Sequence, residues 1–381
     1  MYLERQLSLE RDLVHRSVFL FGPRQTGKTT LLRRRYSHAR WYNLLRGDEF
    51  LRLSAEPWRL HEELAGLKPG SVVVIDEIQR LPSLLNEVHG LIEERDLRFV
   101  LTGSSPVKLT RGGVNLLGGR ARMRYLSPLV FPEFDAWDLD RIASIGSLPA
   151  IFLAEDPWED LRSYVGTYLQ LEIRAEGLVR GIESFSRFLR VAAIGAGDQT
   201  VFEQIASDAQ VPARTIREYY GVLEETLLGR MVQPYHPSRT ASRKAVSRGK
   251  FFFFDVGVVQ ALIGRRSVTP GTGEFGRAVE QYIFTELETW MRYNRVEGEL
   301  MYWRTVDARE VDFVVPERYA VEIKAGGSVG RGDLKGLQAL REDEPGLKPV
   351  LVCGEARPRI VEGIDVLPVG VFLDRLWAGT L

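Results

Sequence analysis

A glycine-rich loop at residues 22–29 constrains this chain more than any other segment, because its sequence, GPRQTGKT, has a phosphate-binding spacing. Gly22 and Gly27 permit backbone conformations that a Cβ atom would hinder, so successive N–H groups can turn toward phosphates. Lys28 can reach the outer phosphates, and the Thr29 hydroxyl can ligate Mg²⁺. A buried-strand pattern precedes the loop and a helical pattern follows it, which is the order that a nucleotide site requires.

The start of that helix adds to the attraction for phosphate, because its N-terminal dipole and unpaired N–H groups favour anions. We therefore expect the whole loop and the first helical residues to contact the nucleotide. The predicted contacts are Gly22, Pro23, Arg24, Gln25, Thr26, Gly27, Lys28, Thr29 and Thr30.

A second motif supports hydrolysis of the nucleotide. Residues 72–76 read VVVID, a buried parallel strand that would deliver acids at its carboxyl edge, and Glu77 follows directly. Asp76 is predicted to hold the Mg²⁺ shell, and Glu77 to orient or deprotonate the attacking water. Together the two motifs predict hydrolysis of a nucleotide, most simply ATP, with Mg²⁺ as cofactor.

Residues 1–135 alternate strand and helix patterns, as a parallel α/β sheet requires. Strands are expected near residues 17–21, 39–44, 72–76, 98–102 and 122–126. The fourth strand ends in hydroxyl residues, so Thr102 or Ser104 could sense the γ-phosphate. A plain turn or helix cap at these hydroxyls is the alternative.

Arg120 follows two glycines and is the candidate for stabilising transition-state charge, in its own subunit or a neighbouring one. A solvated basic strand edge explains the same residues equally well. The sequence shows no clear interface that would predict assembly into a ring.

Composition limits the other possibilities. A length of 381 residues allows two to three domains, and the formal net charge of zero means that nucleic acid would have to be bound by local patches. Cys353 is the single cysteine, the start of the chain lacks a signal-peptide pattern, and no apolar run approaches membrane-spanning length. These features favour a cytoplasmic protein without a membrane partner.

Residues 200–227 have a helix-turn-helix cadence, after a helical connector at residues 136–190. Arg214 and Arg217 would point outward from the second helix, where a recognition helix contacts a DNA groove. Residues 239–250 then carry five cations and no acid, as a phosphate-binding wing would. The candidates there are Arg243, Lys244 and Arg248. Helix pairs of this kind also bind proteins, so the pattern fits either DNA or a protein as the binding partner.

The C-terminal third contains a second set of acidic residues. If residues 310–315 and 319–324 pair as a hairpin, Asp312 lies beside Glu322, and two carboxylates suit Mg²⁺. Period-2 alternation puts Glu322 and Lys324 on one face, where Lys324 would position water or stabilise developing charge. As spacing alone the pattern is weak, and an ordinary sheet edge with a salt bridge accounts for it as well.

The chain as a whole resembles a bacterial and archaeal ATPase family of the AAA+ superfamily with a C-terminal DUF4143 region. The resemblance depends on motifs at residues 22–29, 75–79, 101–105, 119–120, 128–134, 254–257, 309–313 and 321–324. It implies an α/β fold: a parallel-sheet AAA+-type core at residues 1–135, a helical lid at 136–190, a winged helix at 191–250 and a PD-(D/E)xK nuclease-like domain at 251–381. On that last pattern Glu280, Asp312, Glu322 and Lys324 take the site positions, with Val311 where the pattern has proline.

The leading hypothesis is an ATPase that engages DNA through the winged helix, with the nuclease-like domain cutting or holding it. A nucleotide-dependent switch that binds protein is the main alternative. A DNA-binding ATPase with an inactive nuclease fold is the third.

Overall fold

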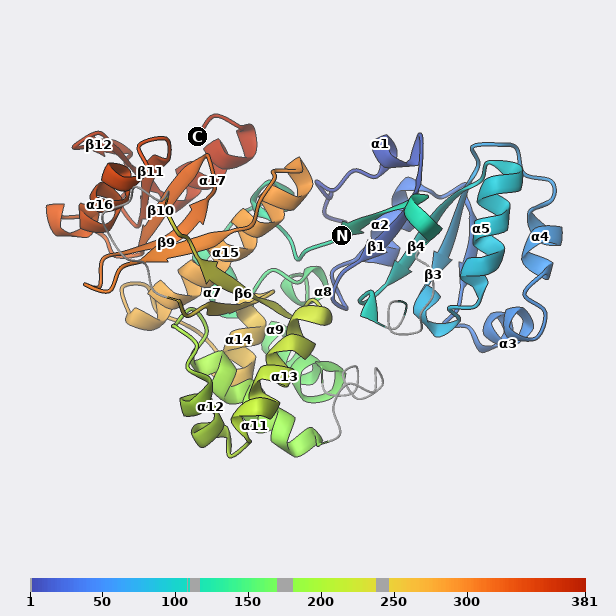
Figure 1. Cartoon of the computed structure of the whole chain (residues 1–381), viewed down its shortest axis with the longest axis horizontal. Helices are drawn as coiled ribbons and strands as arrows, with labels where there is room; N and C mark the ends of the chain where they lie inside the picture. The colour runs from blue at the N-terminus through green and yellow to red at the C-terminus, as the bar shows by residue number, and fades with distance from the viewer. Residues whose placement is uncertain (1, 108, 110–116, 170–180, 238–246) are drawn as a thin grey trace. The chain divides into compact units, whose positions relative to one another are not determined.

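The structure is a computed structural model that describes residues 2–107, 109, 117–169, 181–237 and 247–381. The chain divides into two compact units (Figure 1). The N-terminal unit comprises residues 4–127 and 225–228, and the C-terminal unit is built mainly from residues 128–224 and 229–381. Each unit is described by itself.

The N-terminal unit contains a five-stranded sheet in the order β2-β3-β4-β1-β5, with parallel pairing throughout. The strands are β1 (Ser17–Phe21), β2 (Arg40–Asn43), β3 (Val72–Asp76), β4 (Arg98–Gly103) and β5 (Ala121–Tyr125). Its helices are α1 (Glu10–Leu13), α2 (Lys28–Arg35), α3 (Gly47–Ala55), α4 (Arg59–Leu64), α5 (Leu84–Arg95) and the short turns η1 (Ile78–Arg80) and η2 (Leu117–Gly119). The predicted α/β class and parallel sheet are confirmed, and the five strands lie where they were expected.

Burial explains why this sheet forms. All five residues of β1 are buried, and four of the five in β3 are, as expected for strands covered on both faces. Because the strands are parallel, their carboxyl ends meet at one edge, and the phosphate loop, Asp76 and Thr102 all come from that edge.

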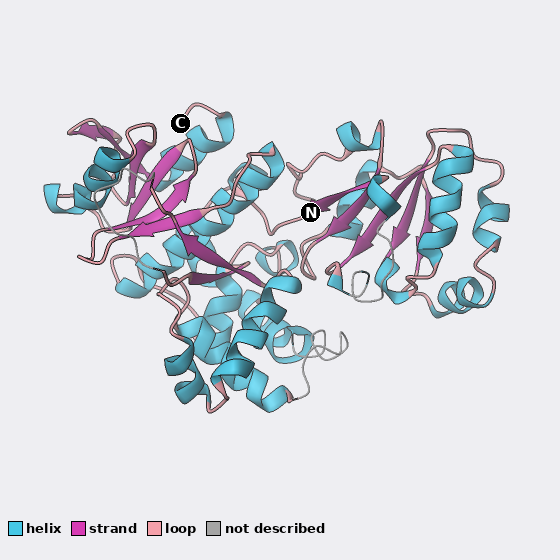
Figure 2. Ribbon diagram, viewed as in Figure 1, coloured by secondary structure: helices cyan, strands magenta, loops and turns pink. Residues whose placement is uncertain are grey.

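The C-terminal unit contains an eight-stranded mixed sheet in the order β12-β13-β11-β10-β9-β8-β6-β7 (Figure 2). Its strands are β6 (Gly229–Pro234), β7 (Lys250–Phe253), β8 (Met301–Arg304), β9 (Glu310–Val315), β10 (Tyr319–Lys324), β11 (Lys348–Cys353), β12 (Arg359–Val361) and β13 (Ile364–Pro368). Its helical segments are η3 (Phe131–Glu133), α7 (Leu139–Ile145), α8 (Pro149–Phe152), α9 (Pro157–Ser163), the π-helix η4 (Tyr164–Leu169), α11 (Ile182–Ile194), α12 (Phe202–Ala209), α13 (Ala213–Glu225), α14 (Val256–Ile263), α15 (Gly273–Asn294), η5 (Arg331–Leu334), α16 (Lys335–Asp343) and α17 (Val369–Ala378).

Two cores cover the two faces of this sheet. Val321 and Ile323 of β10 pack in the core that contains α15, whereas Ala320 packs in the core that contains α16. The expected alternation along β10 is therefore present. Strands β9 and β10 form the predicted antiparallel hairpin, with Val321 opposite Phe313.

The C-terminal unit differs from the expected division into lid, winged helix and nuclease-like domain. Strand β6 pairs antiparallel with β7 and parallel with β8, so the strands after the helix pair are part of the eight-stranded sheet. The expected boundaries at 190/191 and 250/251 fall inside one unit. A shared core spans both positions, and hydrogen bonds of the sheet also span 250/251.

The helix pair itself is present. Helices α12 and α13 lie within the expected range 200–227, and Ile216, Tyr220 and Leu223 are buried on one face of α13. Within the expected helical connector, α9 is followed at Tyr164 by π-helical geometry, and residues 170–180 lie outside the described part. Within the described residues, no helix has the length and apolar character needed to cross a membrane.

Candidate nucleotide site and carboxylate cluster

The loop at residues 22–29 depends on its glycines. A Cβ atom on Gly22 would collide with the backbone oxygen of Leu126, which leaves no room for another residue. Gln25 and Gly27 have φ of 64° and 89°, so the backbone turns through left-handed conformations before α2 begins at Lys28. Left-handed turns of this kind allow successive backbone N–H groups to face a phosphate.

Lys28 lies inside this loop. Its side chain is buried, and Nζ donates to the carbonyl oxygens of Gly22 at 2.5 Å and Pro23 at 3.1 Å. The ammonium group is therefore held at the centre of the loop by groups that phosphate oxygens can replace. Arg24 and Thr30 are exposed on either side of the turn, and the Thr26 hydroxyl donates to the Pro23 carbonyl at 2.9 Å.

Two residues predicted to hold Mg²⁺ meet directly. The Thr29 hydroxyl donates to Oδ2 of Asp76 at 3.0 Å, and the Thr102 hydroxyl donates to Oδ1 of the same carboxylate. One hydroxyl and one carboxylate beside a phosphate loop are hard oxygen donors suited to Mg²⁺, which retains several water ligands. The residues present therefore fit the ion.

Glu77 lies beside this pair and is tied to it through Thr102. The Glu77 N–H donates to the Thr102 hydroxyl at 3.1 Å, and Gln79 Nε2 donates to Glu77 Oε2 at 2.6 Å. Burial raises the pKa of Glu77, although the nearby charges of Lys28 and Arg24 act in the opposite direction. A carboxylate with a raised pKa is better able to accept a proton from water than an ordinary one.

Two further residues contact the loop, and the sequence indicated Ser104 but not Arg5. Arg5 is buried and donates to the Thr26 carbonyl at 2.5 Å and to the Ser127 carbonyl at 2.6 Å, which braces the loop from behind. Ser104 contacts the loop through its backbone, because its carbonyl accepts from the Gly22 N–H at 3.3 Å. No motif surrounds Arg5, so only a structure could reveal it.

Arg120 lies at the other edge of the sheet. Its carbonyl accepts from the N–H of Ser17, the first residue of β1, and β5 runs parallel to β1 from that point. The full length of β1 therefore separates Arg120 from the loop, and its guanidinium pairs with Glu93 of α5. This position does not suit action on a phosphate bound in the same subunit. Action on a neighbouring subunit stays a prediction.

The C-terminal unit brings together the residues predicted from its hairpin. Asp312 Oδ2 accepts from the Ile323 N–H at 2.8 Å, which places Asp312 beside Glu322, and Lys324 Nζ lies 2.5 Å from Glu322 Oε1. Glu280 of α15 joins the group, because Asp312 and Glu280 both lie near a third side chain, that of Lys250.

The sequence indicated neither Glu310 nor Lys250 as a member of this cluster, and Lys250 is the more unexpected of the two. It belongs to the basic stretch expected at the surface, yet its side chain is only 5% exposed. Its Nζ lies 2.5 Å from Glu310, 3.6 Å from Glu280 and 4.0 Å from Asp312. We refer to Lys250, Glu280, Glu310, Asp312, Glu322 and Lys324 as the carboxylate cluster.

Burial dominates the electrostatics of this cluster. It raises the pKa of Glu280 to about 8, with the charge of Asp312 adding to the effect and that of Lys250 opposing it. Burial and the charge of Asp312 also raise the pKa of Glu322 well above its usual range. The pKa of Asp312 is raised by burial, while Lys250 and Lys324 oppose the rise.

The predicted metal ligands do not fit a metal ion in this arrangement. In the described ranges, no three His, Cys, Asp or Glu side chains converge closely enough to hold one. Instead the Lys250 ammonium lies between Glu280 and Asp312, two of the three predicted ligands.

The predicted DNA contacts are exposed where the structure describes them. Arg214 is 91% exposed and pairs with Glu218 at 3.3 Å, whereas Arg217 lies over the Phe202 ring and pairs with Glu203 at 3.0 Å. Arg248 is exposed, and Arg243 and Lys244 lie outside the described residues.

Some motif residues have structural tasks. Asp255 caps α14 by accepting from the Val258 N–H at 3.1 Å and also accepts from the Ser147 N–H at 2.8 Å. A Cβ atom on Gly257 would collide with the Ile145 carbonyl. These contacts fasten residues 254–257 against α7, so this motif serves the fold rather than chemistry.

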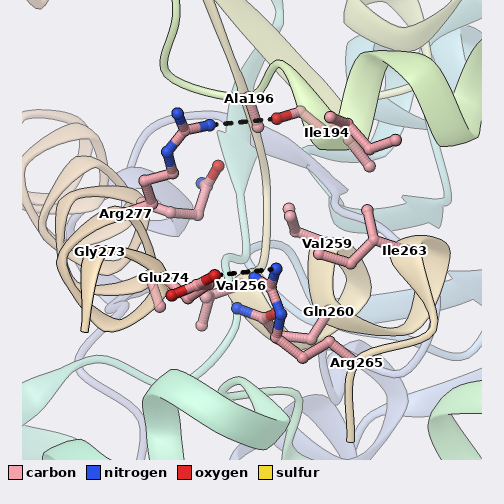
Figure 3. Close-up of a pocket in the computed structure, with 13 residues that line it drawn as sticks. Ile194, Ala196, Val256, Val259, Gln260, Ile263, Arg265, Gly273, Glu274 and Arg277 are labelled. Atoms are coloured by element: carbon pink, nitrogen blue, oxygen red, sulfur yellow. Dashed lines mark hydrogen bonds and ion pairs between the residues drawn. The ribbon is translucent and has the colours of Figure 1, made fainter. Parts of the chain in front are cut away.

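A cavity of about 470 Å³ lies in the C-terminal unit between the end of α11, α14 and the start of α15 (Figure 3). Arg277 donates to the Ile194 carbonyl at 3.4 Å and pairs with Asp198 at 3.1 Å, and Arg265 lies 3.9 Å from Glu274. Each arginine therefore has an acidic partner, and residues predicted from the sequence as functional do not line the cavity.

A parallel sheet with a phosphate loop, a Thr29–Asp76 pair and an adjacent Glu77 defines the class of phosphate-loop ATPases. Comparison with known families agrees: residues 14–135 match the family described as AAA domain. Residues 136–269 and 275–372 match the families described as Domain of unknown function (DUF8612) and Domain of unknown function (DUF4143). The chain therefore carries an AAA domain followed by a DUF4143 region, as the sequence resemblance predicted.

Two curated relatives share most of this length. Uncharacterized protein Rv2008c of Mycobacterium tuberculosis and Uncharacterized protein Mb2031c of Mycobacterium bovis are each 28% identical over 330 residues, covering 82% of this chain and 72% of theirs.

Among solved structures, the Walker-type ATPase PABY2304 of Pyrococcus abyssi is similar with 14% identity and a TM-score of 0.47 over 67% of this chain and 93% of that one. The ORC1 protein of Aeropyrum pernix, solved in complex with DNA, has 16% identity and a TM-score of 0.29 over 69% and 92%.

Proposed function

We propose that this protein is an Mg²⁺-dependent ATPase whose nucleotide cycle controls its binding to DNA. The observation that carries the ATPase part is the network in which Thr102 contacts both Asp76 and Glu77, while Thr29 contacts Asp76 from the phosphate loop. Three side chains and the backbone N–H of Glu77 thus converge on one edge of the sheet.

Each of these residues has a task in the proposed reaction. Lys28 releases the loop carbonyls and neutralises phosphate charge, and Thr29 and Asp76 hold Mg²⁺, which supplies further charge neutralisation when bound. Glu77 orients the attacking water and accepts its proton, while Gln79 and Thr102 keep Glu77 in place.

The DNA part of the proposal is supported by the region from α11 to β7. Three helices followed by an antiparallel pair of strands is the order of a winged helix, and α13 would be its recognition helix. Arg214 and Arg217 lie on the exposed side of α13 and can exchange acidic partners for DNA phosphates. Cleavage of DNA is not part of this proposal, because the carboxylate cluster does not fit a metal.

A nucleotide-dependent switch that binds protein is the second candidate. It is favoured by the pairing of Arg214 with Glu218 and of Arg217 with Glu203, on a helix whose residues have no net positive charge. In that case the exposed face of α13 would contact a protein partner.

The test is steady-state ATP hydrolysis in Mg²⁺ buffer with single-stranded, duplex and branched DNA. We expect at least one DNA to change the rate, and Arg214→Ala/Arg217→Ala to remove this response while basal hydrolysis persists. Arg162→Ala is a matched control, because Arg162 is similarly exposed and pairs with Glu159 at 3.4 Å.

Glu77→Gln should abolish ATP hydrolysis both with and without DNA, but it should still bind ATP. A rate that no DNA changes, together with no DNA binding at low salt, would favour the switch. If Lys28→Ala and Glu77→Gln both still hydrolysed ATP at the natural rate, the ATPase part of the proposal would be contradicted.

A further inference from the structure

We propose that Lys250 is the built-in cation of the carboxylate cluster and stands where the sequence pattern predicts a divalent metal. The C-terminal unit then holds this cluster together without Mg²⁺ or Mn²⁺. The inference concerns the C-terminal unit alone, so it does not depend on ATP hydrolysis or on DNA binding.

The backbone of Lys250 is fixed on both sides. In β7 it pairs with Val232 of β6, and on its other side it forms an isolated bridge with Gln199. The flanking residues extend this second contact, because the Thr200 N–H donates to the Gly249 carbonyl at 2.8 Å and the Gly197 N–H donates to the Phe251 carbonyl at 2.9 Å. Lys250 is therefore a strand residue with one direction available to its side chain.

The side chain of Lys250 passes the ring of Tyr302 and ends beside the carboxylates of the cluster. Its Nζ lies 5.2 Å from the centre of the Tyr302 ring, a favourable cation–π contact. Tyr302 is itself held by the backbone, because its hydroxyl donates to the Arg248 carbonyl. An aromatic wall thus directs the ammonium group toward Glu310, Glu280 and Asp312.

A buried ammonium is stable only where carboxylates surround it, and this requirement is met here. Lys250 is within 4.0 Å of three carboxylates, and Lys324 lies 2.5 Å from the fourth, that of Glu322. Because Lys250 is part of the chain, its ammonium group is always present beside these carboxylates. A divalent ion would have to displace it or tolerate a like charge at close range.

The acids themselves retain the shape of a cation site. Among the described residues, Glu280 Oε1 and Glu322 Oε2 are buried oxygens without a hydrogen-bond partner. If the ammonium of Lys250 were removed, these atoms and Asp312 would need another cation. Removal of the lysine should therefore create metal binding that the natural sequence lacks.

The experiment measures Mn²⁺ binding by electron paramagnetic resonance and calorimetry, without nucleotide. All proteins are full-length and carry Lys28→Ala, which weakens the phosphate loop as a second site. We expect no tight Mn²⁺ site in this parent and one additional site after Lys250→Met, at least about tenfold tighter than any binding by the parent. Adding Asp312→Asn should abolish the new site, and Lys250→Arg, which retains the charge, should not create it.

The variant also has a stability readout. Loss of Lys250 leaves buried acids unpaired, so Lys250→Met should unfold at lower temperature than the parent and regain several degrees with saturating Mn²⁺. The parent and Lys250→Arg should not respond.

Three results would overturn the proposal. One is Mn²⁺ binding by the parent that Asp312→Asn or Glu322→Gln removes. Another is a folded Lys250→Met protein that binds no Mn²⁺. If Lys250→Met does not fold without metal, refolding is repeated with Mn²⁺. The third overturning result is that Mn²⁺ does not restore folding.

Discussion

At the scale of single residues, the Thr102 hydroxyl joins the two acids of the nucleotide site. It donates to Asp76 and accepts from the Glu77 N–H, so one atom orients the proposed metal ligand and the proposed base. We predict that Thr102→Val, which preserves volume but removes the hydroxyl, lowers kcat for ATP hydrolysis by about 10–100-fold, the range expected for leaving buried polar groups unpaired. The affinity for ATP should change much less.

Thr102→Ser is the matched control, because it retains the hydroxyl. It should preserve most of the activity, and thermal unfolding should show that both variants are folded. Equal kcat values for Thr102→Val and the natural protein would show that the hydroxyl does not organise the site.

Individual side chains also show where sequence reasoning reached its limit. The phosphate loop was foreseen because its spacing is specific, and its residues lie as the motif requires. Lys250 was not, because it ends a basic run and precedes four phenylalanines, so no alternation reveals which face it occupies. Arg120 follows two glycines in a plausible position, but only the parallel pairing of β5 with β1 shows at which edge of the sheet it lies.

At the scale of elements, α15 carries a buried acid that connects it to two other segments. Glu286 accepts from the Phe131 N–H at 2.7 Å and from Trp377 Nε1 of α17 at 2.7 Å. Burial raises the pKa of Glu286 to about 8, although these hydrogen bonds act to lower it. The carboxyl group of Glu286 thus adds polar links to the packing of Phe131 and Phe134 against the core that contains α15.

This pKa predicts a pH dependence of stability. Between the ordinary pKa of a glutamate, 4.5, and about 8, the folded state retains a proton that the unfolded state releases. Stability of the C-terminal unit should therefore be greatest at the acidic end of this window and fall as pH rises through about 8.

Thermal unfolding measured from pH 5 to pH 9 checks this expectation. Glu286→Gln mimics the protonated form, so its melting temperature should change less over the same range, while other acids of the unit retain part of the slope. A slope that is identical in the two proteins would assign the effect elsewhere.

The elements themselves were mostly predictable. Strands β1 to β5, the helix pair α12–α13, helix α15 and the β9–β10 hairpin follow from apolar runs and periodicity. The pairing of β6 with β8 was not predictable, because strands that are far apart in the sequence leave no local pattern that identifies them as partners. Through that long-range pairing, the sheet extends across the expected boundary at 250/251 within one compact unit.

At the scale of the whole molecule, two compact units predict two unfolding events. The phosphate loop lies in the N-terminal unit, so a non-hydrolysable ATP analogue with Mg²⁺ should stabilise that unit alone. We expect calorimetry to show two transitions, one of which rises by roughly 5–10 °C when the ligand is about 100-fold above its Kd. Lys28→Ala should remove this rise, and an equal shift of both transitions would mean that the units unfold together.

The position of Arg120 leads to a prediction about assembly. Since Arg120 lies at the sheet edge away from its own loop, any catalytic part it plays requires a second subunit. We expect Arg120→Ala to lower ATP hydrolysis and a mixture with Lys28→Ala protein to recover part of it through mixed sites. Full activity of Arg120→Ala would instead identify the Arg120–Glu93 pair as a surface salt bridge.

The strand pairing of β6 with β8 has a consequence for how such proteins can be divided. The DUF4143 match begins at residue 275, yet Lys250 and strands β6 and β7 precede it. A chain that started there would expose the edge of β8 and leave Glu280, Glu310 and Asp312 without their lysine. The range that matches this family is therefore shorter than the structural unit to which it belongs, and we expect residues 275–372 produced alone to lack part of the sheet and the buried cation of the cluster.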